Sequence, residues 1–216
     1  MIKLIDLLEN KILVTRRSPE ERSKNFLIAT QKKIQQYMKD GSKGNLNLEN
    51  TAITTLPQGL TVGGNLDLSG TKITTLPQGL TVGGNLNLYG TEINSLPQGL
   101  TVGGDLYLED TPITTLPQGL TVGRTLYLFG TKITSLPQDL TVGDYLSLNG
   151  TKITSLPQGL TVGRNLDLAG IPITSLPQDL TVRGTLYLEN TPLSKKYSEE
   201  QIRQMVPGVK GKIIIK

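Results

Sequence analysis

A 20-residue repeat constrains the fold of this chain more than any other feature of its sequence. Residues 56–75 read LPQGLTVGGNLDLSGTKITT, and near-copies begin at Leu76, at Leu96 and then every 20 residues, which gives seven successive copies. A unit of this length cannot bury its apolar side chains by itself, whereas a stack of such units buries them in one continuous core. The repeat therefore predicts a solenoid in which each copy forms one coil.

Each copy contains an alternating segment that predicts a short β-strand. In the copy at 56–75, Leu66 and Leu68 alternate with the polar residues Asn65, Asp67 and Ser69, so one side of the strand is buried and the other faces solvent. The leucine pair recurs at positions 46/48, 86/88, 106/108, 126/128, 146/148, 166/168 and 186/188. We expect these strands to stack in parallel, with the other aliphatic residues of each coil completing the core.

The residues that follow each strand predict a corner in the backbone. Positions 50, 70, 90, 110, 130, 150, 170 and 190 hold only Gly, Asn or Asp, the residues that best tolerate a positive φ angle. The segment Leu56-Pro57-Gln58-Gly59 predicts a second corner, because Pro favours the first central position of a type I turn and Gly the last position. Thr71 recurs in almost every copy, and its hydroxyl group is expected to bond to the backbone of its own coil or of the next one.

The motif LxLxxTxIxxLPxxL resembles the leucine-rich repeat, especially the short 20-residue bacterial type, and the resemblance covers residues 45–194. In the copy at 56–75 and the start of the next one, the matching residues are Leu66, Leu68, Ile73 and Leu76-Pro77. The array is also similar to repeat proteins encoded by bacteria and their phages. The resemblance implies a repeat solenoid, mostly β, with a right-handed stack of coils and one parallel β-sheet of about nine short strands.

Two departures from the family pattern leave a second interpretation open. Thr71 stands where the family has its ladder asparagine, and Gly63, with Val62 beside it, stands where the family has a leucine before the strand. Residues 60–62 could then form a strand of their own. In that case the rod would be straighter than the curved horseshoe of the family.

Residues 1–44 predict a helical cap, because a solenoid exposes its core at both ends. Ser18-Pro19-Glu20-Glu21 is typical of a helix start, with Ser as the N-cap, Pro in the first turn and Glu three residues after the cap. This helix is expected to end near Asp40 and to cover the first coil, and a shorter helix is expected at about 3–13. The predicted buried face of the longer helix consists of Phe26, Leu27, Ile34, Tyr37 and Met38.

Residues 195–216 predict a second cap after the repeat array of residues 45–194. Ser198 and Gln201 have the spacing of a capping box and predict a short helix to about residue 205. Residues 211–215 align with residues 64–68, which places Ile213 and Ile215 on the two leucine columns and predicts a ninth strand. Three lysines would discourage further pairing at that edge, namely Lys210, Lys212 and Lys216.

The composition excludes several kinds of site. The chain has no His and no Cys, so it offers no imidazole base, no thiol nucleophile, no disulfide and no zinc site of the usual ligands. Ten Lys and Arg against five Asp and Glu give residues 1–44 a net charge of +5. Six against eleven give residues 45–194 a net charge of −5, and six against two give residues 195–216 a net charge of +4. A nucleic-acid groove along the acidic array would need the opposite sign, so no nucleic acid is expected to bind there.

The sequence gives no indication of a membrane segment. No run of about 18 apolar residues is present, as a membrane-spanning helix would require. The N-terminal stretch MIKLIDLLENKIL is interrupted by Asp6, Glu9 and Asn10, so it lacks the continuous apolar region of a secretory signal. We therefore expect no membrane contact and a cytoplasmic location.

The letters that vary between copies predict where function lies. Most of the chain's aromatic residues occupy outward strand positions, and two acidic residues lie beside them. The candidate binding residues are Tyr89, Tyr107, Tyr127, Phe129, Tyr145, Tyr187, Asp105 and Glu109. An exposed aromatic cluster with a polar rim is typical of a protein-binding surface, although aromatic pairs on neighbouring strands also stabilise sheets without binding anything.

These residues predict a noncatalytic protein–protein interaction module that needs no cofactor or metal, and that is a monomer until it meets a protein partner. The alternative is a structural or assembly component, such as a phage virion or surface protein, joined through its ends. A third possibility is binding to ice or to a crystal surface through the column of threonines at 61, 81, 101, 121, 141, 161 and 181. No enzymatic activity is expected, because neighbouring carboxylates such as Asp105 and Glu109 lie on an open strand face without a cleft.

Overall fold

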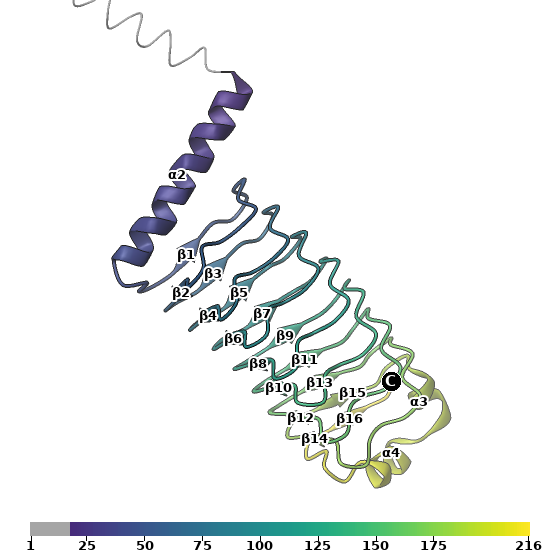
Figure 1. The fold of residues 1–216 in the computed structure, drawn as a ribbon. Coiled ribbons are helices and arrows are strands. Elements are labelled where there is room, and N and C mark those ends of the chain that lie inside the picture. Colours follow the sequence, from purple (N-terminus) through teal and green to yellow (C-terminus); the bar gives the residue numbers. More distant parts are fainter. Residues whose placement is uncertain (1–17) are drawn as a thin grey trace, which may run out of the picture.

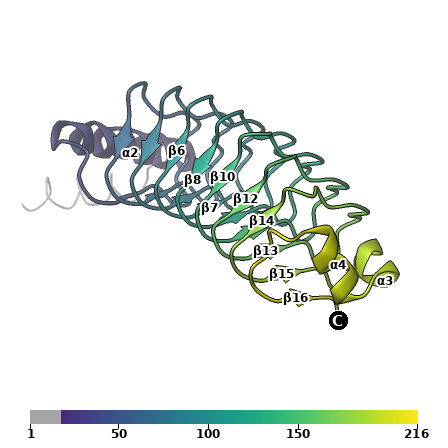
Figure 2. The same cartoon turned by 90° about the horizontal axis from the view of Figure 1, so that it is seen from below.

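The computed structural model describes residues 18–216, which form one elongated, gently bent rod of stacked coils (Figures 1 and 2). A helix precedes the rod, and two short helices and a last strand close its far end. Each coil contributes two strands of two residues, one to each of two parallel sheets that run along the rod. The 20-residue period of the sequence is therefore the length of one coil of the solenoid.

The nine-stranded parallel sheet confirms the prediction from the leucine pairs. Its strands follow the order of the chain, and equivalent residues of successive coils pair directly, as Leu66 does with Leu46 and with Leu86. The strands are β1 (Leu46–Asn47), β3 (Leu66–Asp67), β5 (Leu86–Asn87), β7 (Leu106–Tyr107), β9 (Leu126–Tyr127), β11 (Leu146–Ser147), β13 (Leu166–Asp167), β15 (Leu186–Tyr187) and β16 (Ile213–Ile214). This register places the same position of every copy in one column along the rod.

A second, seven-stranded parallel sheet realises the interpretation that the sequence left open for residues 60–62. One sheet alone was therefore an incomplete description, because the Thr-Val pair of each copy also forms a strand. Its strands are β2 (Thr61–Val62), β4 (Thr81–Val82), β6 (Thr101–Val102), β8 (Thr121–Val122), β10 (Thr141–Val142), β12 (Thr161–Val162) and β14 (Thr181–Val182). In each pair the valine is buried and the threonine points outward.

The core consists of aliphatic columns that run the length of the array. Leu66, Leu68 and Ile73 are fully buried, as are their equivalents in the following coils. Since every coil offers side chains of the same volume at the same place, the core packs uniformly from one coil to the next. A change of volume in one column leaves a void or a clash between two coils, which explains why these letters do not vary.

The corner after each strand of the nine-stranded sheet has the predicted left-handed backbone. Asn50, Asp110 and Asn190 have φ angles of 53°, 55° and 59°, and the glycines at the equivalent places of the other copies have φ angles from 63° to 73°. The Thr71 hydroxyl donates to the Leu68 carbonyl oxygen at 2.7 Å, and its equivalents repeat this bond. The threonine therefore satisfies the backbone of its own coil rather than that of the next coil.

A ladder of side-chain oxygens links successive coils at the residue before each strand. The Asn65 Oδ1 atom accepts a hydrogen bond from the Asn85 backbone N–H at 2.9 Å, and the Asn85 Oδ1 atom does the same for Asp105. The Asn65 oxygen lies where a Cβ atom at Gly84 would have to be. The sequence follows this constraint: wherever one coil has Asn at the position of Asn65, the next coil has Gly at the position of Gly84. Arg124, Asp144 and Arg164 occupy the Gly84 position only after coils that lack this Asn.

The N-terminal helix α2 (Pro19–Lys39) has the predicted capping box between Ser18 and Glu21. Its C-terminal half packs against the first coil, where Thr30 and Ile34 are buried, while its first turns diverge from the rod (Figure 1). The Lys33 ammonium group donates to the Asn47 carbonyl oxygen at 2.5 Å and so covers part of the open edge of β1.

One predicted contact of this helix is wrong. Phe26 does not belong to the buried face, since 53% of its surface is exposed. It lies one turn before the buried Thr30, where α2 diverges from the rod, whereas Leu27, Tyr37 and Met38 are partly buried against the core. The short helix expected at about 3–13 lies outside the described residues.

The C-terminal end confirms the predicted helix and ninth strand. Helix α4 (Glu199–Met205) begins with a capping box between Ser198 and Gln201, and β16 pairs with β15 so that Ile213 lies opposite Leu186. A short helix, α3 (Pro192–Lys196), was not predicted; Thr191 caps it, so the last copy bends into a helix where earlier copies continue to the next corner. Val209 also pairs with Val182, which extends the second sheet into the cap.

Candidate functional site

The outward side of the nine-stranded sheet carries the residues that differ most between copies. We define the strand face as the positions 65, 67 and 69 and their equivalents in the first eight strands, which gives 24 positions from 45 to 189. None of them is Lys or Arg, six are aromatic and six are acidic. The acidic members are Glu49, Asp67, Asp105, Glu109, Asp167 and Glu189. All eight candidate binding residues of the sequence belong to this face.

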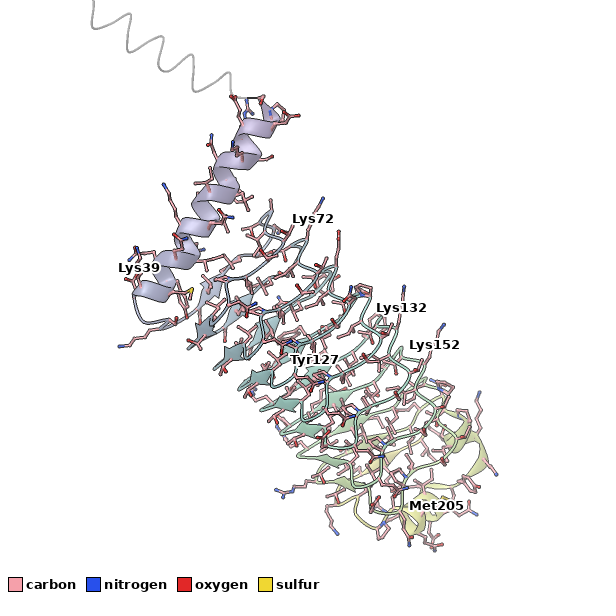
Figure 3. The ribbon with its side chains drawn as sticks, in the orientation of Figure 1. Lys39, Lys72, Tyr127, Lys132, Lys152 and Met205 are labelled. Carbon is pink, nitrogen blue, oxygen red and sulfur yellow. The ribbon has the colours of Figure 1, made fainter. Side chains whose placement is uncertain are left out.

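Three tyrosines form a ring cluster at the middle of the strand face. The register of β7 and β9 places Tyr107 directly opposite Tyr127, and their rings stack with centroids 4.9 Å apart and planes within 8°. Tyr127 also meets the edge of Tyr145 on the next coil, with centroids 6.2 Å apart and an angle of 84°. We call these three residues the tyrosine cluster; Figure 3 marks its central member, Tyr127, on the body of the rod.

Two further aromatic residues lie on the same face but protrude more. Tyr89 and Phe129 are 52% and 53% exposed, and they lie one coil before and one coil after Glu109 in the same column. The Phe129 ring lies over the corner of the next coil, so close to Gly150 that a Cβ atom added there would be 2.8 Å from the ring. The register places Tyr89 on the coil before Tyr107, and Phe129 lies on the same coil as Tyr127.

Tyr187 lies near the end of the sheet, and it is close enough to Tyr145 to contribute to the raised pKa of that residue. It pairs with Asp167 on one side and with Ile214 of the last strand on the other. Its ring is half-buried. The sequence grouped it with the other outward aromatic residues only by its position in the repeat.

Two carboxylates hold the hydroxyl groups of the tyrosine cluster. The Tyr107 hydroxyl donates to Asp105 Oδ2 at 3.4 Å, and the Tyr145 hydroxyl donates to Asp167 Oδ2 at 2.9 Å. Burial, followed by these neighbouring carboxylates, raises the pKa of both tyrosines. Asp167 is not among the candidate binding residues that the sequence indicated. It reaches the cluster because Tyr145 precedes its strand and leans across to the next one, a contact that the 20-residue offset alone does not reveal.

Asp105 and Glu109 occupy different environments on either side of Tyr107. Asp105 is buried, accepts a hydrogen bond from the Thr125 backbone N–H at 3.0 Å and lies 4.0 Å from the Arg124 guanidinium group. Burial raises the pKa of Glu109, and its Oε2 atom is buried without a hydrogen-bond partner. Asp105 is therefore part of the ladder between coils, whereas burial disfavours the ionised form of the Glu109 carboxylate.

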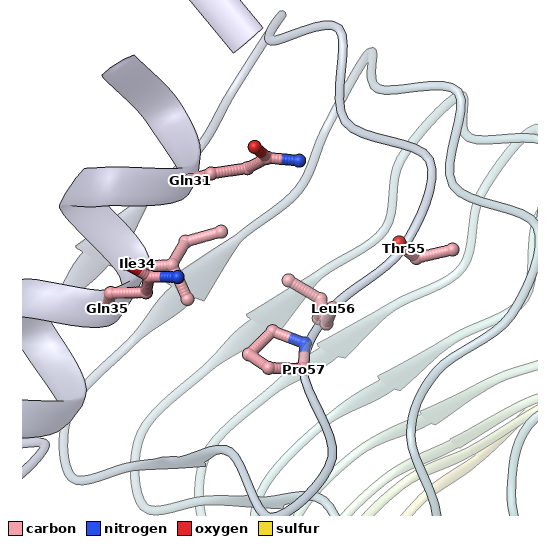
Figure 4. Close-up of a pocket in the computed structure, with 6 residues that line it drawn as sticks. All are labelled: Gln31, Ile34, Gln35, Thr55, Leu56 and Pro57. Carbon is pink, nitrogen blue, oxygen red and sulfur yellow. The ribbon is translucent and has the colours of Figure 1, made fainter. Parts of the chain in front are cut away.

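The groove between α2 and the first coil is a separate feature (Figure 4). It has a volume of about 340 Å³ and is lined by Gln31, Ile34, Gln35, Thr55, Leu56 and Pro57. The lining offers two amide groups and one hydroxyl beside apolar surface, and none of these six side chains is acidic, basic or a thiol. The groove therefore lacks an acid–base pair of the kind that most hydrolytic chemistry requires.

Other classes of site can be compared with the described part of the chain. Among residues 18–216, no three Asp or Glu side chains come close enough together to hold a metal ion. Within the same range, no helix has both the length and the apolar character needed to cross a membrane.

Comparison with known proteins adds a likeness to solved structures. No protein-family model matches the sequence, and no curated protein sequence matches it significantly. Among solved structures, the chain is similar to a leucine-rich-repeat protein of Leptospira interrogans, with 26% sequence identity and a TM-score of 0.47 over 77% of this chain. The match covers 54% of that protein, so this chain spans about half of its length.

Proposed function

We propose that this protein is a noncatalytic protein-interaction module that binds its partner through the strand face. A leucine-rich-repeat-like solenoid suits this task, because its stacked coils give a rigid and extended surface whose outward residues can vary without disturbing the core. The proposal concerns which residues do the binding, and it rests on the tyrosine cluster.

The tyrosine cluster supports the proposal because its rings are held in place before a partner arrives. Tyr127 contacts the rings of both Tyr107 and Tyr145, and two carboxylates fix the outer hydroxyl groups. Ordered tyrosines lose little conformational entropy on binding, and aromatic residues with a polar rim dominate the affinity of many protein interfaces. The exposed rings of Tyr89 and Phe129 extend the apolar area on either side.

The experiment is affinity capture from a lysate of the organism that encodes the protein. The immobilised wild type is compared with Tyr107→Ala/Tyr127→Ala, and circular dichroism establishes that both baits are folded. The proposal expects a specific protein that the wild type retains and the double variant loses. Equal retention by the two folded baits would refute the strand face as the binding surface.

An assembly component joined through its ends is the alternative, and the charge at the last strand weighs against it. Lys212 and Lys216 are exposed beside β16, where another chain would have to pair. Desolvating two ammonium groups at a strand edge opposes such pairing. Light scattering over a range of concentrations distinguishes the two, since the interaction module stays a monomer and the assembly component forms larger species.

A further inference from the structure

We propose that the strand face binds a segment of its partner that carries arginine, with a guanidinium group stacked on the tyrosine cluster. This inference rests on the proposed function and names the chemistry of the partner. It is carried by two observations that are independent of each other, namely the one-sided charge of the face and the geometry of the stacked rings.

The strand face is acidic and has no cation of its own over its first eight strands. Six of its 24 positions are carboxylates, and none is Lys or Arg. The lysines of the array, Lys72, Lys132 and Lys152, project from the edge of the rod in Figure 3, away from Tyr127. A partner segment with carboxylates would be repelled here, whereas one with cations would be attracted and steered toward the face.

Two arginines at the corner beside the face each lie near a carboxylate of the preceding coil. Arg124 lies 4.0 Å from Asp105 and Arg164 lies 3.6 Å from Asp144. Asp67, two strands before Tyr107, and Glu109, two residues after it, have no neighbouring cation on the face itself. The lysines at 212 and 216 belong to the ninth strand, at the far end of the sheet.

The stacked rings favour arginine over lysine. Tyr107 and Tyr127 lie 4.9 Å apart and nearly parallel, which is the spacing of adjacent strands. Asn87 pairs with Tyr107 on the side away from Tyr127, so a planar group placed above Asn87 would continue the stack of rings. Asp67 pairs with Asn87 on the next strand, so its carboxylate lies beside that position. A guanidinium group is planar, stacks on aromatic rings and bonds to carboxylates through its fork of N–H groups, whereas an ammonium group is a compact point charge.

The test begins with selection from a random library of 12-residue displayed peptides. The library is selected in parallel on the wild type and on Tyr107→Ala/Tyr127→Ala, and clones specific to the wild type are sequenced. One synthetic peptide from this set is then compared with copies in which each Arg is replaced by Lys or by citrulline, which keeps the shape and removes the charge. Isothermal titration calorimetry gives the Kd of each peptide.

The inference predicts that clones specific to the wild type are enriched in Arg. It also predicts that citrulline weakens binding about tenfold or more and Lys weakens it several-fold, as expected for a lost cation–π contact. Asp67→Asn keeps the hydrogen bonds that Asp67 accepts from Ser69 and removes its charge, so it should weaken the Arg peptide and leave the citrulline peptide unchanged. Glu92→Gln, an exposed residue outside the strand face, should change neither.

Two results would overturn the inference. Clones that depend on Tyr107 and Tyr127 but show no Arg enrichment would refute the partner chemistry and leave the proposed function intact. The absence of any clone specific to the wild type would refute an arginine-bearing segment as the partner. Lysate capture remains the separate test of the proposed function.

Discussion

The two sheets of the rod share one core but differ in their outward residues. In the seven-stranded sheet, every outward strand residue from Thr61 to Thr181 is threonine. In the nine-stranded sheet, the equivalent outward position holds Asn, Asp, Tyr or Ser in the first eight strands. Since both sheets bury their other side in the same core, the core does not require this variation. The comparison shows that the coil architecture tolerates change on the strand face, which is where we place the binding surface.

The largest expected effect separates the shared core from the outward positions. Leu126 is fully buried between the two sheets, so Leu126→Ala should lower the free energy of unfolding by about 2–5 kcal/mol, through lost burial and the cavity left behind. The matched control is Thr121→Ala on the outward side of the other sheet, which should change it by less than about 0.5 kcal/mol. Urea unfolding followed by circular dichroism measures both. Equal losses would contradict the division into fixed core and free surface.

A second prediction concerns the coupling between coils. An added side chain at Gly84 has to displace the Asn65 oxygen, so Gly84→Asp should destabilise the rod by about 1–3 kcal/mol. In the Asn65→Thr background the loss should be smaller, because Thr125 and Asp144 form the same pair naturally. A double-mutant cycle in urea measures the difference. Strictly additive losses would mean that the Asn-Gly pairing between coils is not the constraint.

The third prediction asks how much the tyrosine cluster stabilises its sheet. Tyr127 makes one stacked and one edge contact, so Tyr127→Ala should lower the free energy of unfolding by about 1–2 kcal/mol. Tyr89→Ala, at a half-exposed ring on the same face, should change it by less than about 0.5 kcal/mol. Thermal unfolding compares the two variants. A loss above about 4 kcal/mol for Tyr127→Ala would make sheet stabilisation the main role of the cluster.

The smallest expected effect depends on pH. Burial raises the pKa of Glu109 above its ordinary value of 4.5, so its ionised form is disfavoured in the folded state. The wild type therefore loses stability as the pH rises from the ordinary pKa through the raised one. Glu109→Gln should be slightly more stable than the wild type near pH 7, by less than about 1 kcal/mol, and should lose this advantage below about pH 4. Melting curves at both pH values measure this difference, with Glu92→Gln as the exposed control. A stability advantage of Glu109→Gln that persisted in acid would contradict the account.

The parts of the fold that repeat were predictable, because each rule could be checked in several copies. The left-handed corners followed from the choice of Gly, Asn and Asp alone, and the ninth strand followed from aligning residues 211–215 with a repeat. The exposure of Phe26 could not be predicted, since it depends on the angle between α2 and the first coil, which no repeat encodes.

Part of the candidate site was predictable for the same reason. The contact between Tyr107 and Tyr127 followed from their shared position in adjacent copies, but the bond from Tyr145 to Asp167 did not, because it joins different positions of two coils. The ladder from Asn65 to the next coil also escaped the sequence analysis. Its signal was present, since Asn in one copy is always followed by Gly in the next at the crowded position.

The most direct test of the strand face compares the two sheets in one capture experiment. Three baits are used, namely the wild type, Tyr107→Ala/Tyr127→Ala/Phe129→Ala on the nine-stranded sheet and Thr101→Ala/Thr121→Ala/Thr141→Ala on the seven-stranded sheet. Retained proteins are quantified by mass spectrometry after each bait is shown to be folded. The account predicts a protein retained equally by the wild type and the threonine variant and lost from the aromatic variant. A protein lost from the threonine variant, or retained equally by all three baits, would contradict it.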